Sequence, residues 1–501
     1  MIVMKLGGSS LESPEAIRRA CGIIHSHLQR RPIVVVSALG KTTDHLIDLA
    51  GEASLGRGYA ARKLLNEIQD LHFGLAAELI APARRENVEQ RFRKAFRELF
   101  GLIHDLSEDG RILTAEVLDT IASYGERLSS ELVAAALPEA GVPAVHLEAR
   151  ELIVTDEHFG AAVPFYWETY ARVRREIAQM PDNCVAVLGG FIGATEDGRT
   201  TTLGRGGSDL TASLAGAAVC ADEIQIWTDV DGMLTCDPRV YGGVHRLRQI
   251  SYAEAATMAA AGAKVLHPDT MQPAIRQQIP LVIRNSHRPH CEGTRIVPAA
   301  APAVSLVKSI AVIQNLLLLA IRPPVKQNTA GTPDTVKDYL QRRTVGAVFI
   351  KRTADLIYAA FPNTSPVKKI EMDLDGCVEG RVLMNYSVIT LVGTGVERDR
   401  TIVSRIEAAL KGMELIEFHS GEASNGVSFA LPQRQSRRAC ELLHREFFST
   451  LDESLFAPAI SEPVLTETPS APLVNPLVSY AIRKTRILAR LSLGGHLNGA
   501  H

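Results

Sequence analysis

Residues 204–209, Gly-Arg-Gly-Gly-Ser-Asp, place a cation, a hydroxyl and a carboxylate in one glycine-rich corner. An apolar run from Cys184 to Leu188 precedes this region, and a helix expected from Leu210 follows it. Glycine lets a backbone approach a ligand closely, and a helix N-terminus carries positive partial charge. Arg205 is suited to bind a carboxylate or phosphate through two hydrogen bonds, and Asp209 is suited to bind an ammonium group or a metal ion. The corner predicts a site for one small zwitterion, or for a phosphate with its metal, rather than a plain surface turn.

Two further loops follow short apolar strands. Lys5 ends the expected strand 2–5 and precedes a Gly-Gly-Ser-Ser turn, where a lysine can reach a phosphoryl group that is being transferred. The alternative is an ordinary strand-end lysine in solvent. Thr228 ends the expected strand 223–228, Asp229 begins the turn after it, and Arg239 stands ten positions further on. This second group predicts a nucleotide and metal pocket with Arg239 on phosphate, and a simple Asp-Gly turn is the alternative.

Three other motifs carry weaker signals. Residues 58–136 are helical in pattern, and we expect a turn at Ser123–Ser129 that presents Glu126 to a substrate amine. Lys264 follows an alanine-rich helix and could supply a second phosphate contact. Gly40-Lys41-Thr42 resembles the tail of a phosphate-binding P-loop, but the leading glycine of that motif would fall on Val35. A P-loop NTPase is therefore rejected.

Composition narrows the class of protein. The chain has 501 residues, 46% hydrophobic and 22% charged, with a formal net charge of -2, so no basic surface for nucleic acid is expected. No apolar run approaches a membrane-spanning length, and no leader peptide is recognisable. The seven cysteines have no CxxC spacing, which is typical of reduced thiols in the cytoplasm.

Strands alternating with helices predict one α/β domain over residues 1–298 with a doubly wound, mainly parallel sheet, whose expected strands include 32–36, 184–188, 223–228 and 279–284. The loops 5–10, 37–44, 189–193 and 228–239 then lie at the carboxyl ends of strands, where such sheets bind ligands. After a Pro-Ala linker, two compact units follow at 304–380 and 381–460. The β-α-β-β-α order of the second, and roughly of the first, predicts two small ferredoxin-like units in tandem. In the first unit we expect strands at 304–313, 316–321, 345–350 and 356–361 and a helix at 334–342. Residues 461–501 read as a linker with a tail helix.

The combination of motifs resembles the aspartate kinases. The order is Lys5-Leu-Gly-Gly-Ser-Ser, Val35-Val-Ser-Ala, Ser123-Tyr-Gly-Glu-Arg-Leu-Ser, Gly190-Phe-Ile-Gly, Thr201-Thr-Leu-Gly-Arg-Gly-Gly-Ser-Asp, Trp227-Thr-Asp-Val, Thr235-Cys-Asp-Pro-Arg and Gly262-Ala-Lys-Val-Leu-His-Pro. The match covers essentially all of residues 1–298, and the tandem units resemble that family's paired ACT domains.

This resemblance implies an amino-acid-kinase fold and transfer of the ATP γ-phosphate to the side-chain carboxylate of L-aspartate, giving 4-phospho-L-aspartate. It also implies a place at the start of lysine, threonine and methionine synthesis. Carried over by position, Lys5 and Asp209 would be catalytic. The residues that would hold aspartate are Thr43, Glu126, Arg205 and Asp209. Those that would line the ATP site are Lys5, Gly7, Gly8, Ser37, Thr228, Asp229, Arg239, Lys264 and Val265. Mg²⁺ would bridge the phosphates, with no protein metal site.

The resemblance further implies a cytoplasmic homodimer formed through the ACT domains, with lysine or threonine as effector. Here the sequence departs from the family, because Arg322 to Pro333 replaces the usual glycine-containing turn of the first ACT unit. Two alternatives remain. One is a relative acting on glutamate, acetylglutamate or a nucleotide, and the other is a regulatory subunit that binds amino acids. We expect no fused homoserine dehydrogenase, because few residues follow the ACT units and no GxGxxG motif stands among them.

Overall fold

The structure is a computed structural model that describes residues 1–108, 111–263, 266–322, 349–352, 357–362, 379–418 and 425–459. Its contacts group the chain into two compact units. Among the described residues, unit 1 contains residues 1–232 and 266–298, and unit 2 contains residues 233–263 and 299–459. The predicted domain boundary at residue 298 stays a prediction.

Unit 1 is built from the following elements, in chain order: β1 (Ile2–Leu6), η1 (Gly8–Ser10), α1 (Pro14–Ser26), η2 (Leu28–Arg30), β2 (Pro32–Val36), α2 (Thr42–Ser54), α3 (Gly58–Leu79), α4 (Pro82–Ser107), α5 (Ala115–Ala136), η3 (Leu137–Ala140), β3 (Ala144–Leu147), α6 (Ala149–Leu152), α7 (Tyr166–Gln179), β4 (Val185–Gly189), β5 (Ile192–Ala194), β6 (Thr200–Thr202), α8 (Gly207–Val219), β7 (Glu223–Thr228), η4 (Pro268–Met271), α10 (Gln272–Arg276), β10 (Leu281–Asn285) and β11 (Thr294–Val297). The predicted strands 32–36 and 223–228 have the predicted bounds.

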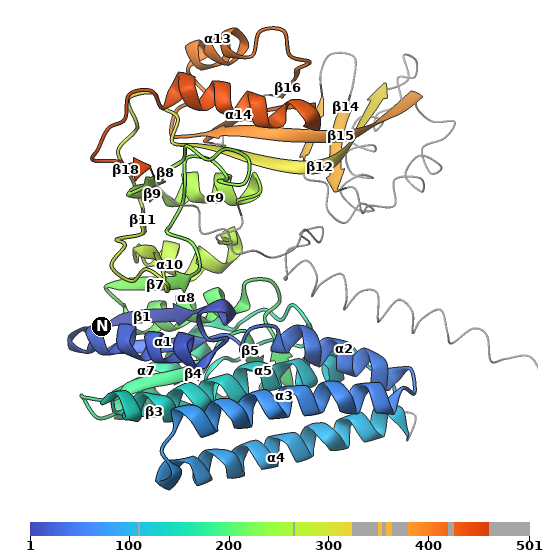
Figure 1. Cartoon of the computed structure of the whole chain (residues 1–501), viewed down its shortest axis with the longest axis vertical. Helices are drawn as coiled ribbons and strands as arrows, with labels where there is room; N and C mark the ends of the chain where they lie inside the picture. Colours follow the sequence, from blue (N-terminus) through green and yellow to red (C-terminus); the bar gives the residue numbers. More distant parts are fainter. Residues whose placement is uncertain are drawn as a thin grey trace, which may run out of the picture. The chain divides into compact units, whose positions relative to one another are not determined.

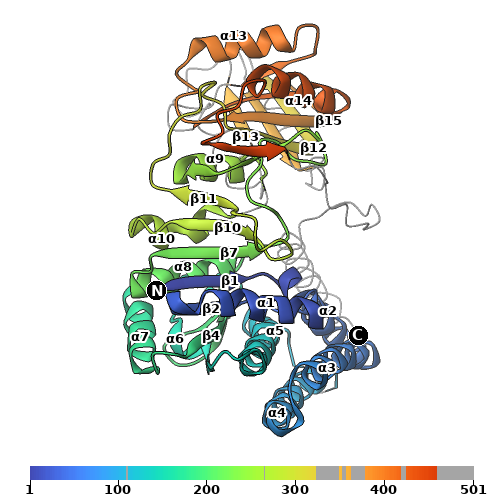
Figure 2. The same ribbon diagram turned by 60° about the vertical axis from the view of Figure 1, so that its left-hand side comes forward.

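The main sheet of unit 1 runs in the order β3-β4-β2-β1-β7-β10-β11, and every neighbouring pair is parallel except β10 with β11. Strands β1, β2 and β4 are buried almost throughout, which explains their unbroken apolar sequences. Figure 2 shows α1 and α5 on one side of these strands and α7, α8 and α10 on the other. The predicted doubly wound, mainly parallel sheet is confirmed.

Long helices lie beside this sheet. Figure 1 shows α3 and α4 as an antiparallel pair next to α5. Between these two helices, the ring of His72 packs edge-on against Phe92 and Phe96, with ring centroids 5.9 and 6.2 Å apart. Its imidazole is fully buried, so burial lowers the pKa of His72 to about 4.

Unit 2 comprises these elements: β8 (His245–Leu247), β9 (Gln249–Ser251), α9 (Tyr252–Ala260), β12 (Ser309–Arg322), β13 (Phe349–Arg352), β14 (Ile357–Pro362), β15 (Glu379–Val392), α13 (Arg400–Ala409), β16 (Ile416–Phe418), β17 (Gly426–Pro432), α14 (Gln433–Phe447) and β18 (Phe456–Ala459). A six-stranded sheet has the order β13-β14-β12-β15-β17-β16. Its described pairs are antiparallel, as in two ferredoxin-like units joined edge to edge. The helix expected over 334–342 lies outside the described residues.

One prediction in this unit is wrong. The sequence suggested two strands, 304–313 and 316–321, but the structure has the single strand β12. A bulge between Ile313 and Leu316 interrupts its register with β15, and Asn315 adopts a positive φ of 59° there. Asparagine tolerates that conformation, so the chain bends without ending the strand.

A buried ion pair fixes α9 within unit 2. Lys308 Nζ lies 2.9 Å from Glu254 Oε2, and both side chains are 0% exposed. The other carboxylate oxygen of Glu254 accepts hydrogen bonds from the backbone N–H and the hydroxyl of Thr394, both at 2.8 Å. Every charge is thus matched by a partner, as a buried pair requires.

Candidate active site

The carboxyl ends of parallel strands bring the predicted loops together. Lys5 pairs in register with Val35 on one side and Ile226 on the other, and Val36 pairs with Gly189. The loops after β1, β2, β4 and β7 therefore leave the sheet at one edge, as the sequence predicted.

Lys5 is held by an acidic partner. Its Nζ lies 2.8 Å from Asp209 Oδ1, and the two side chains are only 13% and 15% exposed. Asp209 lies in the first turn of α8, which begins at Gly207 and not at Leu210 as the sequence suggested. The earlier start places both Ser208 and Asp209 at the positive end of the helix. The structure thus pairs two of the predicted site residues directly.

Glu126 has an unusual environment. It is 3% exposed, and its Oε1 accepts a hydrogen bond of 3.2 Å from the backbone N–H of Ala38. Its Oε2 is buried and has no hydrogen-bond partner within the described residues. Burial raises the pKa of Glu126 to about 8, against the opposing effects of the backbone N–H groups and the Lys5 charge. A buried carboxylate oxygen that lacks a donor is suited to receive one from a ligand.

The expected turn around Glu126 is wrong. Residues 123–129 lie inside the unbroken helix α5. A Cβ at Gly125 would lie 2.8 Å from the Cβ of Ala38, so the glycine is there to let α5 approach the loop after β2. The same construction places Thr43 Oγ1 only 3.5 Å away, which brings Thr43 to this side of α5.

Two more glycines, at the end of β4, allow close packing around the site. A Cβ at Gly189 would lie 3.0 Å from the carbonyl oxygen of Glu126, and one at Gly190 would lie 2.7 Å from the Cα of Ser208. Because backbone cannot give way easily, only glycine allows β4 to lie this close to both α5 and α8.

The loops after β1 and β2 also touch. The N–H of Gly40 donates to the carbonyl of Gly8 at 3.2 Å, and that of Gly7 donates to the carbonyl of Trp227 at 3.1 Å. The N–H of Gly7 is therefore already engaged. The Ser37 hydroxyl donates to Ser208 Oγ at 3.0 Å. Ser208 was part of the predicted corner but had been assigned no role of its own.

Arg205 behaves differently from the other predicted residues. Its side chain is exposed, and it has no hydrogen-bond or ion-pair partner within the described ranges. Gly204 and Gly206 on either side adopt positive φ angles of 72° and 68°. The guanidinium is thus carried at the tip of a tight turn with its donors available to a ligand.

The end of β7 carries the predicted nucleotide residues. Thr228 Oγ1 donates to Asp229 Oδ1 at 3.0 Å, and the carbonyl of Asp229 accepts from Asn285 Nδ2 at 3.3 Å. The Ser286 hydroxyl donates to the carbonyl of Thr228 at 3.1 Å. Asn285 and Ser286 were missed, although they follow a predicted strand and the strand-end rule could have found them.

Three predicted ATP-site residues remain, namely Arg239, Lys264 and Val265. Arg239 belongs to unit 2, where its Nε donates to Asp237 Oδ1 at 2.9 Å. Lys264 and Val265 lie outside the described residues. Within the described ranges, no three His, Cys, Asp or Glu side chains gather in a way that could hold a metal ion.

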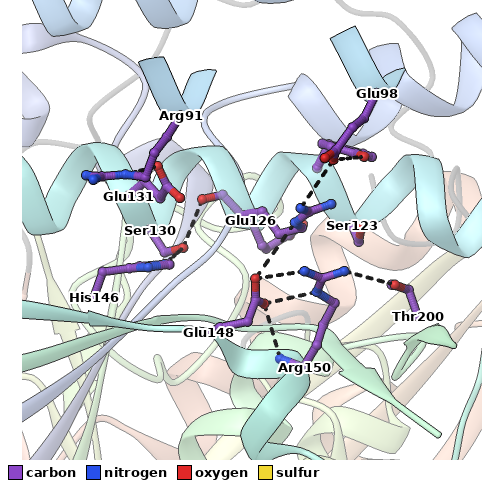
Figure 3. Close-up of polar contacts among 12 residues, drawn as sticks. Arg91, Glu98, Ser123, Glu126, Ser130, Glu131, His146, Glu148, Arg150 and Thr200 are labelled. Atoms are coloured by element: carbon purple, nitrogen blue, oxygen red, sulfur yellow. Dashed lines mark hydrogen bonds and ion pairs between the residues drawn. The ribbon is translucent and has the colours of Figure 1, made fainter. Parts of the chain in front are cut away.

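A polar network supports the helix that carries Glu126. Figure 3 shows Glu98, Glu148 and Arg150 around α5. Arg127 lies 3.8 Å from Glu98 and 4.0 Å from Glu148, and Glu148 accepts two hydrogen bonds from Arg150 at 3.0 and 2.9 Å. Arg150 also donates to Thr200 Oγ1 at 3.4 Å, so the network reaches β6.

Comparison with known proteins identifies the family. The model of the Amino acid kinase family matches residues 1–285. Aspartokinase 1, chloroplastic, of Arabidopsis thaliana is 32% identical over 481 residues, covering 91% of this chain and 82% of that protein. The chain belongs to the aspartokinases.

Solved structures agree with this assignment. Escherichia coli aspartokinase III in complex with aspartate and ADP, in its R-state, matches with a TM-score of 0.75 at 26% identity, covering 89% of this chain and 100% of that one. The same enzyme in complex with lysine and aspartate, in its T-state, matches with a TM-score of 0.77 at 27% identity, covering 89% and 99%. The predicted kinase domain with ACT-type regulatory units is therefore confirmed. Across the part of the chain that the structure describes, no helix has the length and apolar character needed to cross a bilayer.

Proposed function

We propose that Lys5, Glu126, Arg205 and Asp209 form the site at which this aspartokinase phosphorylates L-aspartate. As a member of its family, the chain transfers the γ-phosphate of ATP to the side-chain carboxylate of that amino acid. The observation that carries the assignment is the complementarity of the site to a zwitterion. Glu126 offers a buried oxygen without a donor, and Arg205 offers donors without an acceptor. The E. coli relative was solved with aspartate and ADP bound.

In this assignment Arg205 binds the α-carboxylate of aspartate, whereas Glu126 and Asp209 face its ammonium end. Thr43, on the same side of α5, adds a hydroxyl. The side-chain carboxylate of the substrate is the nucleophile, and it is already ionised at neutral pH. No general base is needed, so catalysis rests on positioning and on stabilising charge.

Lys5 supplies the charge for the transfer step. In the structure it is paired with Asp209, which holds the ammonium group within the site. When ATP binds, Lys5 would neutralise the charge that develops on the transferring phosphoryl group. The start of α8 and the hydroxyls of Ser37 and Ser208 would add further donors.

We assign the ATP site to the residues that the family motifs indicate: Lys5, Gly7, Gly8, Ser37, Thr228, Asp229, Arg239, Lys264 and Val265. Mg²⁺ would accompany ATP as its phosphate-bound ion and neutralise phosphate charge. Such an ion would be held mainly by phosphate oxygens and water, with few protein ligands.

We further propose a homodimer formed through the ACT units, with lysine as the effector. The support is the six-stranded antiparallel sheet of unit 2 and the lysine complex of the E. coli relative. Threonine remains the alternative effector. The divergent segment from Arg322 to Pro333 falls almost wholly outside the described residues.

The test is ATP-dependent formation of an acyl phosphate, trapped as its hydroxamate, with L-aspartate, L-glutamate and N-acetylglutamate as separate substrates. We expect turnover with L-aspartate and much less with the other two. Turnover with glutamate or acetylglutamate instead would move the chain to a sister family, and turnover with none would favour a regulatory subunit. Adding lysine or threonine to the same assay shows which of them inhibits.

A further inference from the structure

A buried carboxylate outside the proposed substrate contacts connects the two halves of the site. Asp119 is 0% exposed and lies on α5, two helical turns before Glu126. Its Oδ2 accepts hydrogen bonds from the backbone N–H of Gly160 at 2.6 Å and of Thr202 at 2.9 Å. Its Oδ1 accepts from the Thr202 hydroxyl at 2.9 Å. This carboxylate thus joins α5 to two segments that are distant in sequence.

Both segments lead to Arg205. Thr202 ends β6, three residues before Arg205, and its carbonyl accepts from Ala162 N–H at 2.9 Å. A Cβ at Gly204 would lie 3.1 Å from the carbonyl oxygen of Gly160, so the turn that carries Arg205 packs against the segment that Asp119 holds. Since Arg205 has no partner of its own among the described residues, its position depends on this backbone.

The other two threonines of β6 form hydrogen bonds with partners other than Asp119. Thr200 accepts from Arg150, as Figure 3 shows, and Thr201 shares a 2.7 Å hydrogen bond with the Thr155 hydroxyl. Neither of these bonds is made to α5. Asp119 therefore joins the helix that carries Glu126 directly to the strand and loop that lead into the Arg205 turn.

We propose that Asp119 is a positioning residue for aspartate binding, which sets the separation of the group for the ammonium end from the group for the α-carboxylate. This inference rests on the proposed roles of Glu126 and Arg205. A zwitterion of fixed length is held at both ends only when those two groups are correctly spaced, and a misplacement of about 1 Å can cost about 10²-fold in enzyme efficiency.

The test compares four variants by steady-state kinetics and by calorimetric titration of L-aspartate without nucleotide. Asp119→Ala should raise the aspartate KM and Kd by about 10²-fold while the ATP KM changes less than about twofold. Asp119→Asn should bind aspartate nearly as the parent does, because an amide can turn its oxygen to the two N–H groups and donate to Thr202 Oγ1.

Thr202→Val removes only the contact of the Thr202 hydroxyl with Asp119 and should raise the aspartate KM by about tenfold. This variant tests the proposal even if Asp119→Ala does not fold. Thr201→Val is the matched control, because it loses a buried hydroxyl bond on the same strand and should leave the aspartate KM within about twofold. The proposal is overturned if Thr202→Val and a folded Asp119→Ala keep the parental aspartate KM. It is also overturned if Thr201→Val raises that KM as much, or if the ATP KM rises in parallel. A parent that does not phosphorylate or bind aspartate would instead contradict the proposed function.

Discussion

The environment of Glu126 predicts that aspartate binds more tightly as the pH rises toward 8. Burial raises the pKa of this carboxyl to about 8, so the free enzyme at neutral pH holds it mostly protonated. The substrate ammonium pairs with the ionised form, and binding below pH 8 must therefore release a proton.

The magnitude follows from the pKa. If only the ionised form binds, the apparent aspartate Kd is multiplied by 1 + 10^(8−pH), which is about 33 at pH 6.5 and about 1.3 at pH 8.5. The KM for aspartate should therefore fall about 25-fold across this range. At pH 7, binding should release about 0.9 protons, measurable by calorimetry in buffers of different ionisation enthalpy.

Two variants on α5 separate this effect from general pH effects. Glu126→Gln cannot ionise, so its aspartate KM should be high and nearly independent of pH. Glu131→Gln also changes a carboxylate of α5, and it breaks the ion pair of Glu131 with Arg91 of α4. This variant should keep the pH profile of the parent. An aspartate KM that does not change with pH in the parent, or one that falls equally in Glu126→Gln, would contradict the role assigned to Glu126.

Three further predictions concern packing and stability. Gly190→Ala should cost about 1–3 kcal/mol of folding free energy and most of the activity, because the new Cβ would lie 2.7 Å from the Ser208 Cα. Gly22→Ala has open space around its new Cβ and should lower neither stability nor activity. Thermal unfolding measures the stability of the two variants, and the hydroxamate assay measures their activity. His72 has its pKa lowered from 6.5 to about 4, so the native state cannot take up the proton that the unfolded state binds, and stability is lost as the pH falls from 6.5 toward 4. Between pH 7 and 5, the unfolding free energy of the parent should fall by about 2 kcal/mol more than that of His72→Phe, as measured by urea titration. Equal losses in the two proteins would contradict the lowered pKa assigned to His72. Lys308→Met should destabilise the chain by about 3–5 kcal/mol, because it leaves a buried carboxylate without its cation; an unchanged unfolding midpoint would show that the pair is dispensable.

Much of the site could be predicted because it depends on local patterns. Buried parallel strands read as apolar runs, and the loops at the carboxyl ends of these strands must gather at one edge of the sheet. That rule predicts Lys5, Ser37 and Thr228 at one edge of the sheet, where the strand register puts them, and it applies equally to Asn285. The glycine-rich corner was recognisable because Arg205 and Asp209 stand four residues apart within it.

The rest depends on contacts between distant segments. Gly125 suggested a turn, yet it lies inside α5, because its lack of a side chain admits Ala38, a neighbour from the loop after β2. The hydrogen bonds of Asp119 reach a residue 83 positions away, and no local pattern marks such a pairing. The shifted pKa of Glu126 arises from burial, which only the assembled fold creates.

The catalytic role of Lys5 is tested most directly by the turnover of Lys5→Ala with L-aspartate and ATP. The acyl phosphate product is measured by hydroxamate trapping and by phosphorus NMR. Lys5 is held 2.8 Å from Asp209, and we assign it to the transferring phosphoryl group. The variant should therefore lose about 10²-fold or more in kcat, with a smaller change in the aspartate KM. A folded Lys5→Ala protein with near-parental kcat would contradict the account.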